Sequence, residues 1–171
     1  MRKEQHKYSK NEYLIHCNNG ICIVEEIGIL EIGDASRDYY TLKPFWDSTC
    51  KIYVPTDNDS SIVRRALTRK EAKDMLASIP LIEAAVIDDE KKSKDIYTVL
   101  LKTNNSRDWI SMIKAIRLKH AQRESQGRTL SNIDERYLKK VSELLFGELA
   151  VSLDISVEQA QARVSERLIA Q

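Results

Sequence analysis

The sequence lacks the features of several large classes of protein. In its 171 residues, no run approaches the ~20 consecutive apolar residues that span a bilayer, and we expect no signal peptide and no membrane contact. It has only three cysteines, Cys17, Cys22 and Cys50, without a closely spaced pair of pairs. Such cysteines are typical of reduced thiols in a cytoplasmic protein.

Common catalytic motifs are also missing. The sequence has no glycine-rich phosphate loop, no His-Glu-x-x-His and no Gly-x-Ser-x-Gly. His16, Cys17 and Cys22 are the only neighbouring metal-type ligands, and a tetrahedral zinc site needs a fourth. These residues favour two strand thiols and a turn histidine, and a thiol or zinc enzyme, with metal in the purified protein, is the alternative. We therefore expect no catalytic residue, no metal and no cofactor.

Net charge is nearly absent as well. The formal charge is +1, so any attraction to nucleic acid must be local. Between residues 102 and 128, seven basic residues stand against two acidic ones, a local charge of +5. Helical spacing places Lys114 and Arg117 on one side and Lys119 and Arg123 on another. Such faces can bind phosphates with salt-sensitive affinity, whereas charge alone favours a solvated helix face.

The first third of the chain carries strand and turn signals. Two strand-like runs, Tyr39–Lys43 and Cys50–Val54, flank a turn-prone segment, and Pro55 ends the second because it cannot donate a ladder hydrogen bond. An Asn-Gly turn joins two earlier runs, Tyr13–Ile15 and Ile21–Val24. Four or five short strands within about sixty residues predict a small, strongly bent sheet or barrel.

The rest of the chain is predicted to be helical. Thr68 and Ser156 begin capping boxes, and Ser106 and Ser131 are predicted caps of long helices. Trp109 heads a stripe at helical spacing that we assign to the core, with Met112, Ile113 and Ile116, and a further apolar stripe lies at Ile96, Val99 and Leu100. The predicted fold is α+β, with a β-rich domain at 1–62 followed by a helical domain of about five helices at 63–171.

Several segments, taken in order, resemble one family. In the first part they are Tyr13–His16, Asn19–Cys22, Val24–Ile27, Asp38–Pro44 and Ile52–Asn58. In the second part they are Ser78–Pro80, Trp109–Lys119, Asp134–Leu138 and Leu144–Ala150. From about residue 12 onward, this ordered set resembles the CarD-like family of bacterial transcription regulators, which shares its front domain with the transcription-repair coupling factor. The sequence looks closest to the clostridial-type branch.

The resemblance implies a non-enzymatic regulator with an N-terminal Tudor/SH3-like β-barrel. In that family the β-domain binds the RNA polymerase β subunit through an exposed strand, whose unpaired amides and carbonyls accept another chain. By motif match, the polymerase-binding residues here are Lys51, Ile52, Tyr53 and Val54. Some relatives have an arginine in place of Tyr53, so we expect a less ionic contact. The alternative is that Tyr53 only fills the sheet surface.

The resemblance also implies a helical domain on promoter DNA, at the upstream edge of the melted bubble. Relatives commonly wedge a tryptophan into the minor groove there. Val86 is its counterpart in this sequence, and we expect weaker wedging because valine offers less contact area. The residues expected to bind DNA are Val86, Lys91, Lys92, Lys114, Arg117, Lys119 and Arg123.

The resemblance thus implies a cytoplasmic, nucleoid-associated transcription regulator. It would bind the RNA polymerase β subunit and promoter DNA, and modulate formation of the open complex. The alternative is a protein-interaction module that binds RNA polymerase or another partner without engaging DNA. Near-neutral charge and the missing tryptophan favour this alternative.

Overall fold

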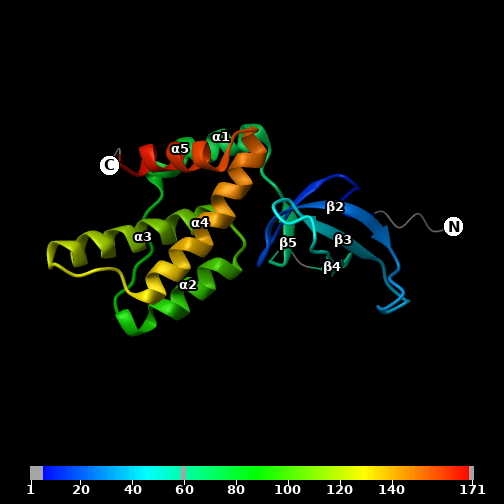
Figure 1. The fold of residues 1–171 in the computed structure, drawn as a ribbon, viewed down its shortest axis with the longest axis horizontal. Coiled ribbons are helices and arrows are strands. Elements are labelled where there is room, and N and C mark those ends of the chain that lie inside the picture. Colours follow the sequence, from blue (N-terminus) through cyan, green and yellow to red (C-terminus); the bar gives the residue numbers. More distant parts are fainter. Residues whose placement is uncertain (1–5, 59–60, 170–171) are drawn as a thin grey trace. The chain divides into compact units, whose positions relative to one another are not determined.

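The chain divides into two compact units, Met1–Ala66 and Leu67–Gln171. A computed structural model describes residues 6–58 and 61–169, and within them the fold is α+β (Figure 1). Five strands make up the sheet of the first unit, and five α-helices follow in the second. The predicted fold class and helix number are therefore confirmed.

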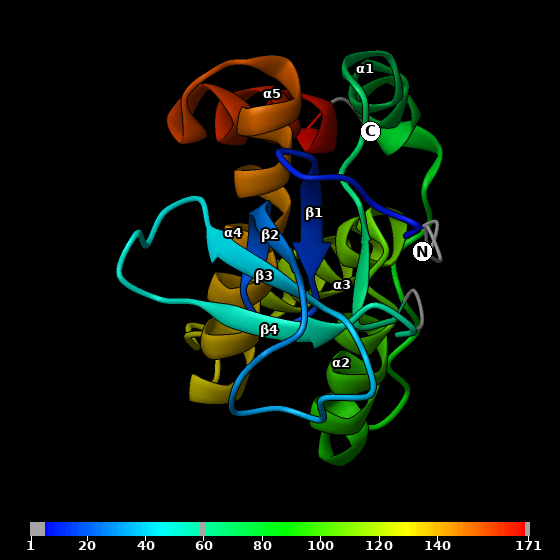
Figure 2. The ribbon, with the colours of Figure 1, turned by 90° about the vertical axis from the view of Figure 1, so that its right-hand side faces the viewer.

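The first unit is a curled antiparallel sheet with the strand order β4-β3-β2-β1-β5 (Figure 2). Its strands are β1 (Tyr13–His16), β2 (Gly20–Gly28), β3 (Tyr39–Pro44), β4 (Ile52–Pro55) and β5 (Val63–Arg65). Strands β3 and β4 form the predicted hairpin, with Thr41 opposite Tyr53. Strand β5 pairs with β1, so the sheet extends past residue 62, where the sequence places the end of the first domain.

One face of this sheet forms the core of the first unit. The buried side chains come from every strand: Leu14, Cys22, Val24, Tyr40, Leu42, Val54 and Val63. Tyr8 completes the core from the preceding segment. Its backbone N–H donates to the Tyr40 hydroxyl at 3.2 Å, and its own hydroxyl donates to the Val63 carbonyl at 3.3 Å. Tyr8 therefore links β3 to β5.

The second unit packs around one long helix. Its helices are α1 (Arg69–Ser78), α2 (Ser93–Lys102), α3 (Ser106–Ser125), α4 (Asn132–Leu153) and α5 (Val157–Ile169), with short 3-10 turns η1 (Ile79–Leu81) and η2 (Glu90–Lys92). Helix α4 contacts all four other helices (Figure 1). The predicted core position of Trp109 is confirmed, because its side chain is fully buried.

The helix ends follow local sequence with one exception. Thr68 and Ser156 both form capping boxes, and the Ser131 side chain accepts from the Asp134 amide at the start of α4. The prediction of Ser106 as a cap is wrong. Asn105 caps α3 by accepting from the Arg107 amide, and Ser106 is the first helical residue. Asparagine and serine are comparably good caps, so adjacent candidates are hard to separate from sequence.

Candidate functional site

Strand β4 lies at one margin of the sheet, and no further strand of the described residues pairs with it. The Thr56 N–H donates to the Asp38 carbonyl at 3.0 Å, which fixes the alternation of backbone groups along the strand. In an antiparallel pair, residues alternately bond to the partner strand and point away from it. Ile52 and Val54 therefore bond to β3, whereas the N–H and C=O groups of Tyr53 point outward. We call these outward groups the β4 edge. Lys51 lies just before the strand, and its carbonyl accepts from the Cys50 thiol at 4.0 Å.

The same alternation divides the side chains. Val54 is buried and Ile52 packs against the core, whereas Tyr53 is 50% exposed. The Lys51 ammonium lies 3.1 Å from the Glu25 carboxylate, and the hydrogen bond and charge of Glu25 raise the pKa of Lys51. The charge of Lys51 is thus already paired within the unit. A partner at the β4 edge meets mainly backbone groups and the Tyr53 ring.

The two margins of the sheet differ in how their outward groups are used. At the β5 margin, the Val63 carbonyl accepts from the Tyr8 hydroxyl, and the Arg65 carbonyl accepts from the Arg64 guanidinium. At the β4 margin, Pro55 has no N–H and its carbonyl accepts from Asn58. Tyr53 lies between, and within the described residues its outward N–H and C=O have no hydrogen-bond partner. This makes β4 the margin suited to another chain.

In the second unit, the segment between η1 and η2 is fastened to α3. The Ser111 hydroxyl donates to the Glu83 carbonyl at 2.8 Å, and the Ala85 amide donates to the Ser111 carbonyl at 3.1 Å. Val86 follows directly and is 74% exposed. The predicted wedge residue is therefore at the surface, and the residues just before it are hydrogen-bonded to α3.

Lys114, which the sequence places among the DNA-binding residues, is buried in the helical unit. Its side chain is 6% exposed, and its ammonium donates to the carbonyls of Ile79 and Ile82, both at 2.6 Å. Burial lowers the pKa of this lysine. Lys114 therefore holds the η1 turn against α3.

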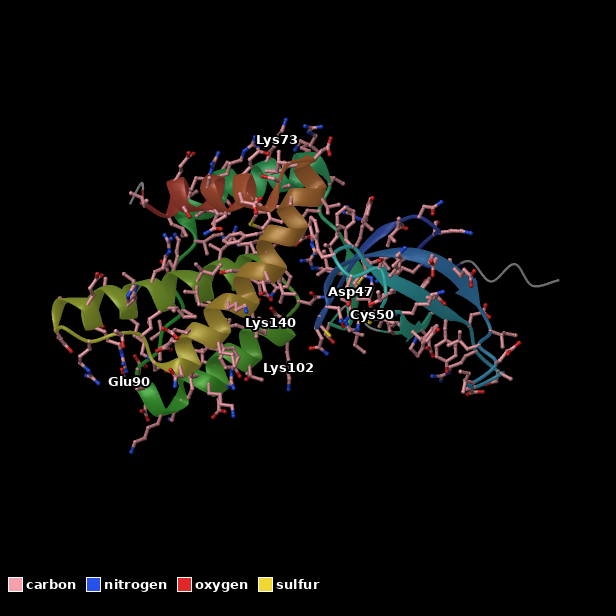
Figure 3. All side chains as sticks on the ribbon, in the orientation of Figure 1. Asp47, Cys50, Lys73, Glu90, Lys102 and Lys140 are labelled. Carbon is pink, nitrogen blue, oxygen red and sulfur yellow. The ribbon has the colours of Figure 1, made fainter. Side chains whose placement is uncertain are left out.

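Two other expected DNA contacts are also engaged inside the unit. The Lys119 ammonium lies 3.0 Å from the buried Asp134 carboxylate, which also accepts from the Tyr97 hydroxyl at 2.8 Å. Arg123 donates to the Thr129 carbonyl at 3.3 Å and to Glu90, which lies just before α2 (Figure 3), at 3.1 Å. The local charge of +5 thus overstates the free charge. Of the seven expected DNA-binding residues, Val86, Lys91, Lys92 and Arg117 are exposed.

Cys22 is poorly suited to nucleophilic chemistry. Cys22 is fully buried, and burial, together with the nearby Cys50 thiol, raises its pKa to about 12. A thiol with such a pKa is almost entirely protonated at neutral pH and is a poor nucleophile. Across residues 6–58 and 61–169, no three His, Cys, Asp or Glu side chains are arranged to hold a metal.

Trp46, in the turn between β3 and β4, is 58% exposed. Its ring lies edge-on to Phe45, with centroids 4.6 Å apart, and Phe45 in turn contacts Tyr13. This exposed aromatic cluster depends on the pairing of distant strands. The spacing of these residues in the sequence gives no signal for it.

Comparison with known proteins finds a family match that covers most of the first unit. Residues 8–67 match the family model described as the CarD-like/TRCF RID domain, an RNA polymerase-interacting domain with a protein-binding and not a catalytic activity. The match includes all five strands and the β4 edge. A search of curated proteins found no match. In the described residues, no helix is long and apolar enough to cross a membrane.

Proposed function

We propose that this protein is a CarD-like bacterial transcription regulator that binds the RNA polymerase β subunit by strand addition at the β4 edge. The observation that carries the proposal is the position of this unpaired margin within the segment similar to an RNA polymerase-interacting domain. A Tudor/SH3-like fold for the first unit, action in the cytoplasm at the nucleoid, and membership of the clostridial-type branch are part of the same proposal.

The β4 edge defines how the incoming strand would bind. Tyr53 offers one outward N–H and one outward C=O, so a strand laid beside β4 would exchange its hydrogen bonds mainly with Tyr53. Pro55 limits the interaction at one end because it has no N–H. Ile52 and Val54 contribute by fixing the strand on the core. Since Lys51 is paired with Glu25, specificity would come mainly from contact with the exposed Tyr53 ring.

The helical unit would contact promoter DNA through its exposed residues. Lys91, Lys92 and Arg117 can neutralise phosphates, and Val86 would make the apolar contact with the minor groove. Lys114, Lys119 and Arg123 would act indirectly, by holding the segments that carry these residues. By binding the open complex and the closed complex with different affinities, the protein would shift the equilibrium between them.

One observation favours a second candidate function, a protein-interaction module that binds RNA polymerase without DNA. Lys114, Lys119 and Arg123 are all occupied by acceptors within the helical unit, which leaves few cations for phosphates. A salt titration separates the two functions. Phosphate-mediated binding weakens steeply between 50 and 200 mM salt, by a factor of about a thousand for six contacts, and strand addition need not.

The central test is retention of the isolated polymerase β-lobe on the immobilised full chain. Tyr53→Pro removes the outward N–H at the centre of the β4 edge, and we expect it to abolish retention. The double variant Lys51→Glu/Tyr53→Glu changes the charge and shape of the strand surface and should weaken retention of the β-lobe. Ile32→Pro is the matched control, because Ile32 is fully exposed and lies outside every strand. Equal retention of all four proteins would remove β4 from the proposal.

A further inference from the structure

A hollow with a volume of about 460 Å³ opens on the surface of the helical unit. It is bounded by residues 80–84, by α3 and by α5, and its apolar wall includes Leu81, Ile82, Leu118 and Leu168. Leu81 and Leu118 are 81% and 59% exposed, so the wall is not covered by the rest of the unit. This volume lies within the range of about 300–1,000 Å³ that is usual for small-molecule sites.

Two cations line the same hollow, Lys114 and Arg117. Lys114 is 94% buried (6% exposed), and an ammonium has three N–H donors. Two of them donate to the Ile79 and Ile82 carbonyls, and within the described chain the third has no acceptor. Within the described residues, no carboxylate oxygen lies within 4.0 Å of a side-chain nitrogen of Lys114 or Arg117. Since Glu83 is the one acid of the described lining, the hollow has a net charge of +1.

This arrangement leaves a buried charge without a counter-ion. Placing an ammonium away from water is costly unless it is paired, and backbone carbonyls supply only partial negative charge. The other buried or half-buried cations of α3, Lys119 and Arg123, each meet a carboxylate of this unit. Lys114 differs from them in having a free donor beside an apolar hollow. An external anion would complete its coordination.

The wall indicates which kind of anion. It consists of leucine, isoleucine, proline and alanine side chains, with no aromatic ring among the described lining residues. Nucleobases bind best when they stack on aromatic rings, so the wall favours a saturated chain over a base. Arg117, at the exposed rim, can bind a carboxylate with two parallel hydrogen bonds.

We propose that this hollow is a binding site for a small aliphatic carboxylate. The chain packs on Leu81, Ile82 and Leu118, and the carboxylate accepts from the third hydrogen of Lys114 and from the Arg117 guanidinium. The site is separate from the β4 edge and does not depend on the proposed role in transcription. Arg117 belongs to both the carboxylate site and the proposed DNA surface, so the carboxylate and DNA would compete for it.

Calorimetric titration of the full chain with octanoate tests the proposal, with 1-octanol and inorganic phosphate as matched probes. We expect saturable binding of one octanoate, about tenfold tighter than either probe, because only octanoate has both parts of the ligand. Arg117→Glu should weaken octanoate binding by about tenfold or more. Arg107→Glu makes the same change of charge on an exposed residue of α3 outside the hollow, and should retain binding.

A second variant tests the apolar wall that would contact the aliphatic chain of the ligand. Leu118→Asp places a carboxylate on the exposed wall residue and should abolish octanoate binding, while circular dichroism checks that the helices persist. Equal affinity for octanoate and octanol, tighter binding of phosphate, or equal loss in the Arg107 and Arg117 variants would each overturn the proposal. So would the absence of saturation at millimolar octanoate.

Discussion

The Lys119 ammonium lies 3.0 Å from the Asp134 carboxylate, and this contact joins α3 to the first turn of α4. Asp134 is fully buried, and its carboxylate also accepts from the hydroxyls of Tyr97 and Ser131 at 2.8 and 2.7 Å. Three helices thus meet at one acid. Lys119, which the sequence assigns to DNA binding, is thus paired with a buried acid of the helical unit.

The stability of the helical unit should fall in acid because of Asp134. Burial by itself would raise the pKa of this carboxyl, but hydrogen bonds from Ser131, Tyr97 and Lys119 and the charge of Lys119 lower it overall. A carboxyl whose pKa is lower in the folded than in the unfolded chain stabilises the fold at pH values above its unfolded-state pKa, which is near 4. This stabilisation is lost as the pH falls through the pKa of the folded state. Urea unfolding of the full chain between pH 2 and pH 7 measures it.

Asp134→Asn should destabilise the helical unit by about 3 kcal/mol at pH 7, since Lys119 then loses its carboxylate in a largely buried position. The variant should also lose much of the acid dependence. Asp74→Asn is the matched control, because Asp74 forms an ion pair of the same length with Lys70 on the exposed side of α1. If both variants unfold alike, the buried contact has no special contribution.

Tyr8→Phe should loosen β5. The variant removes the hydroxyl that donates to the Val63 carbonyl, a bond whose net value is about 0.5–1.5 kcal/mol. Hydrogen exchange of the Cys17 and Ala66 amides, which bond across β1 and β5, should accelerate about two- to tenfold. Tyr13→Phe, at an exposed position whose hydroxyl makes no hydrogen bond among the described residues, should leave exchange unchanged. Unchanged exchange in both variants would mean that Tyr8 does not secure this margin.

Local signals were readable from the sequence, and distant pairing was not. The capping boxes at Thr68 and Ser156 involve residues three apart, and the buried stripe at Trp109 lies on one helix, so both follow from spacing alone. The partners of Lys114 are carbonyls more than thirty residues away, and backbone groups leave no mark in composition. A count of charges along α3 therefore could not separate buried cations from exposed ones.

Helix α2 shows the same limit for apolar residues. Ile96, Val99 and Leu100 form the stripe that spacing predicts, yet Tyr97 is the residue that is fully buried, whereas Val99 is 63% exposed. The Tyr97 hydroxyl reaches Asp134 on α4, and this bond requires Tyr97 to face inward. The inward face of α2 thus carries a polar contact with an acid that lies 37 residues away in the sequence. Periodicity identifies the faces and does not choose between them.

The proposed DNA surface makes a prediction about salt. Neutralising Lys91, Lys92 and Arg117 together should weaken DNA binding and reduce the salt slope by about 0.9 for each phosphate that the protein no longer neutralises, hence by up to about 2.7. Binding to a promoter fragment from 50 to 200 mM salt measures the slope. The matched control neutralises Lys94, Lys102 and Arg107, which are exposed cations outside the proposed surface. Equal changes in both triple variants would indicate unspecific attraction.

Val86→Trp should increase affinity for a forked promoter probe that contains melted bases. Val86 is 74% exposed on a segment held against α3, so a larger side chain fits there without displacing the core. Stacking of one base on an aromatic ring contributes about 1–3 kcal/mol, which predicts a gain of about fivefold or more. Val99→Trp provides the control, since it places the same ring at an exposed position of α2. A gain for the forked probe over the intact duplex should appear only in the Val86 variant. Equal gains at both positions, or none at residue 86, would overturn the assignment of Val86 as the wedge position.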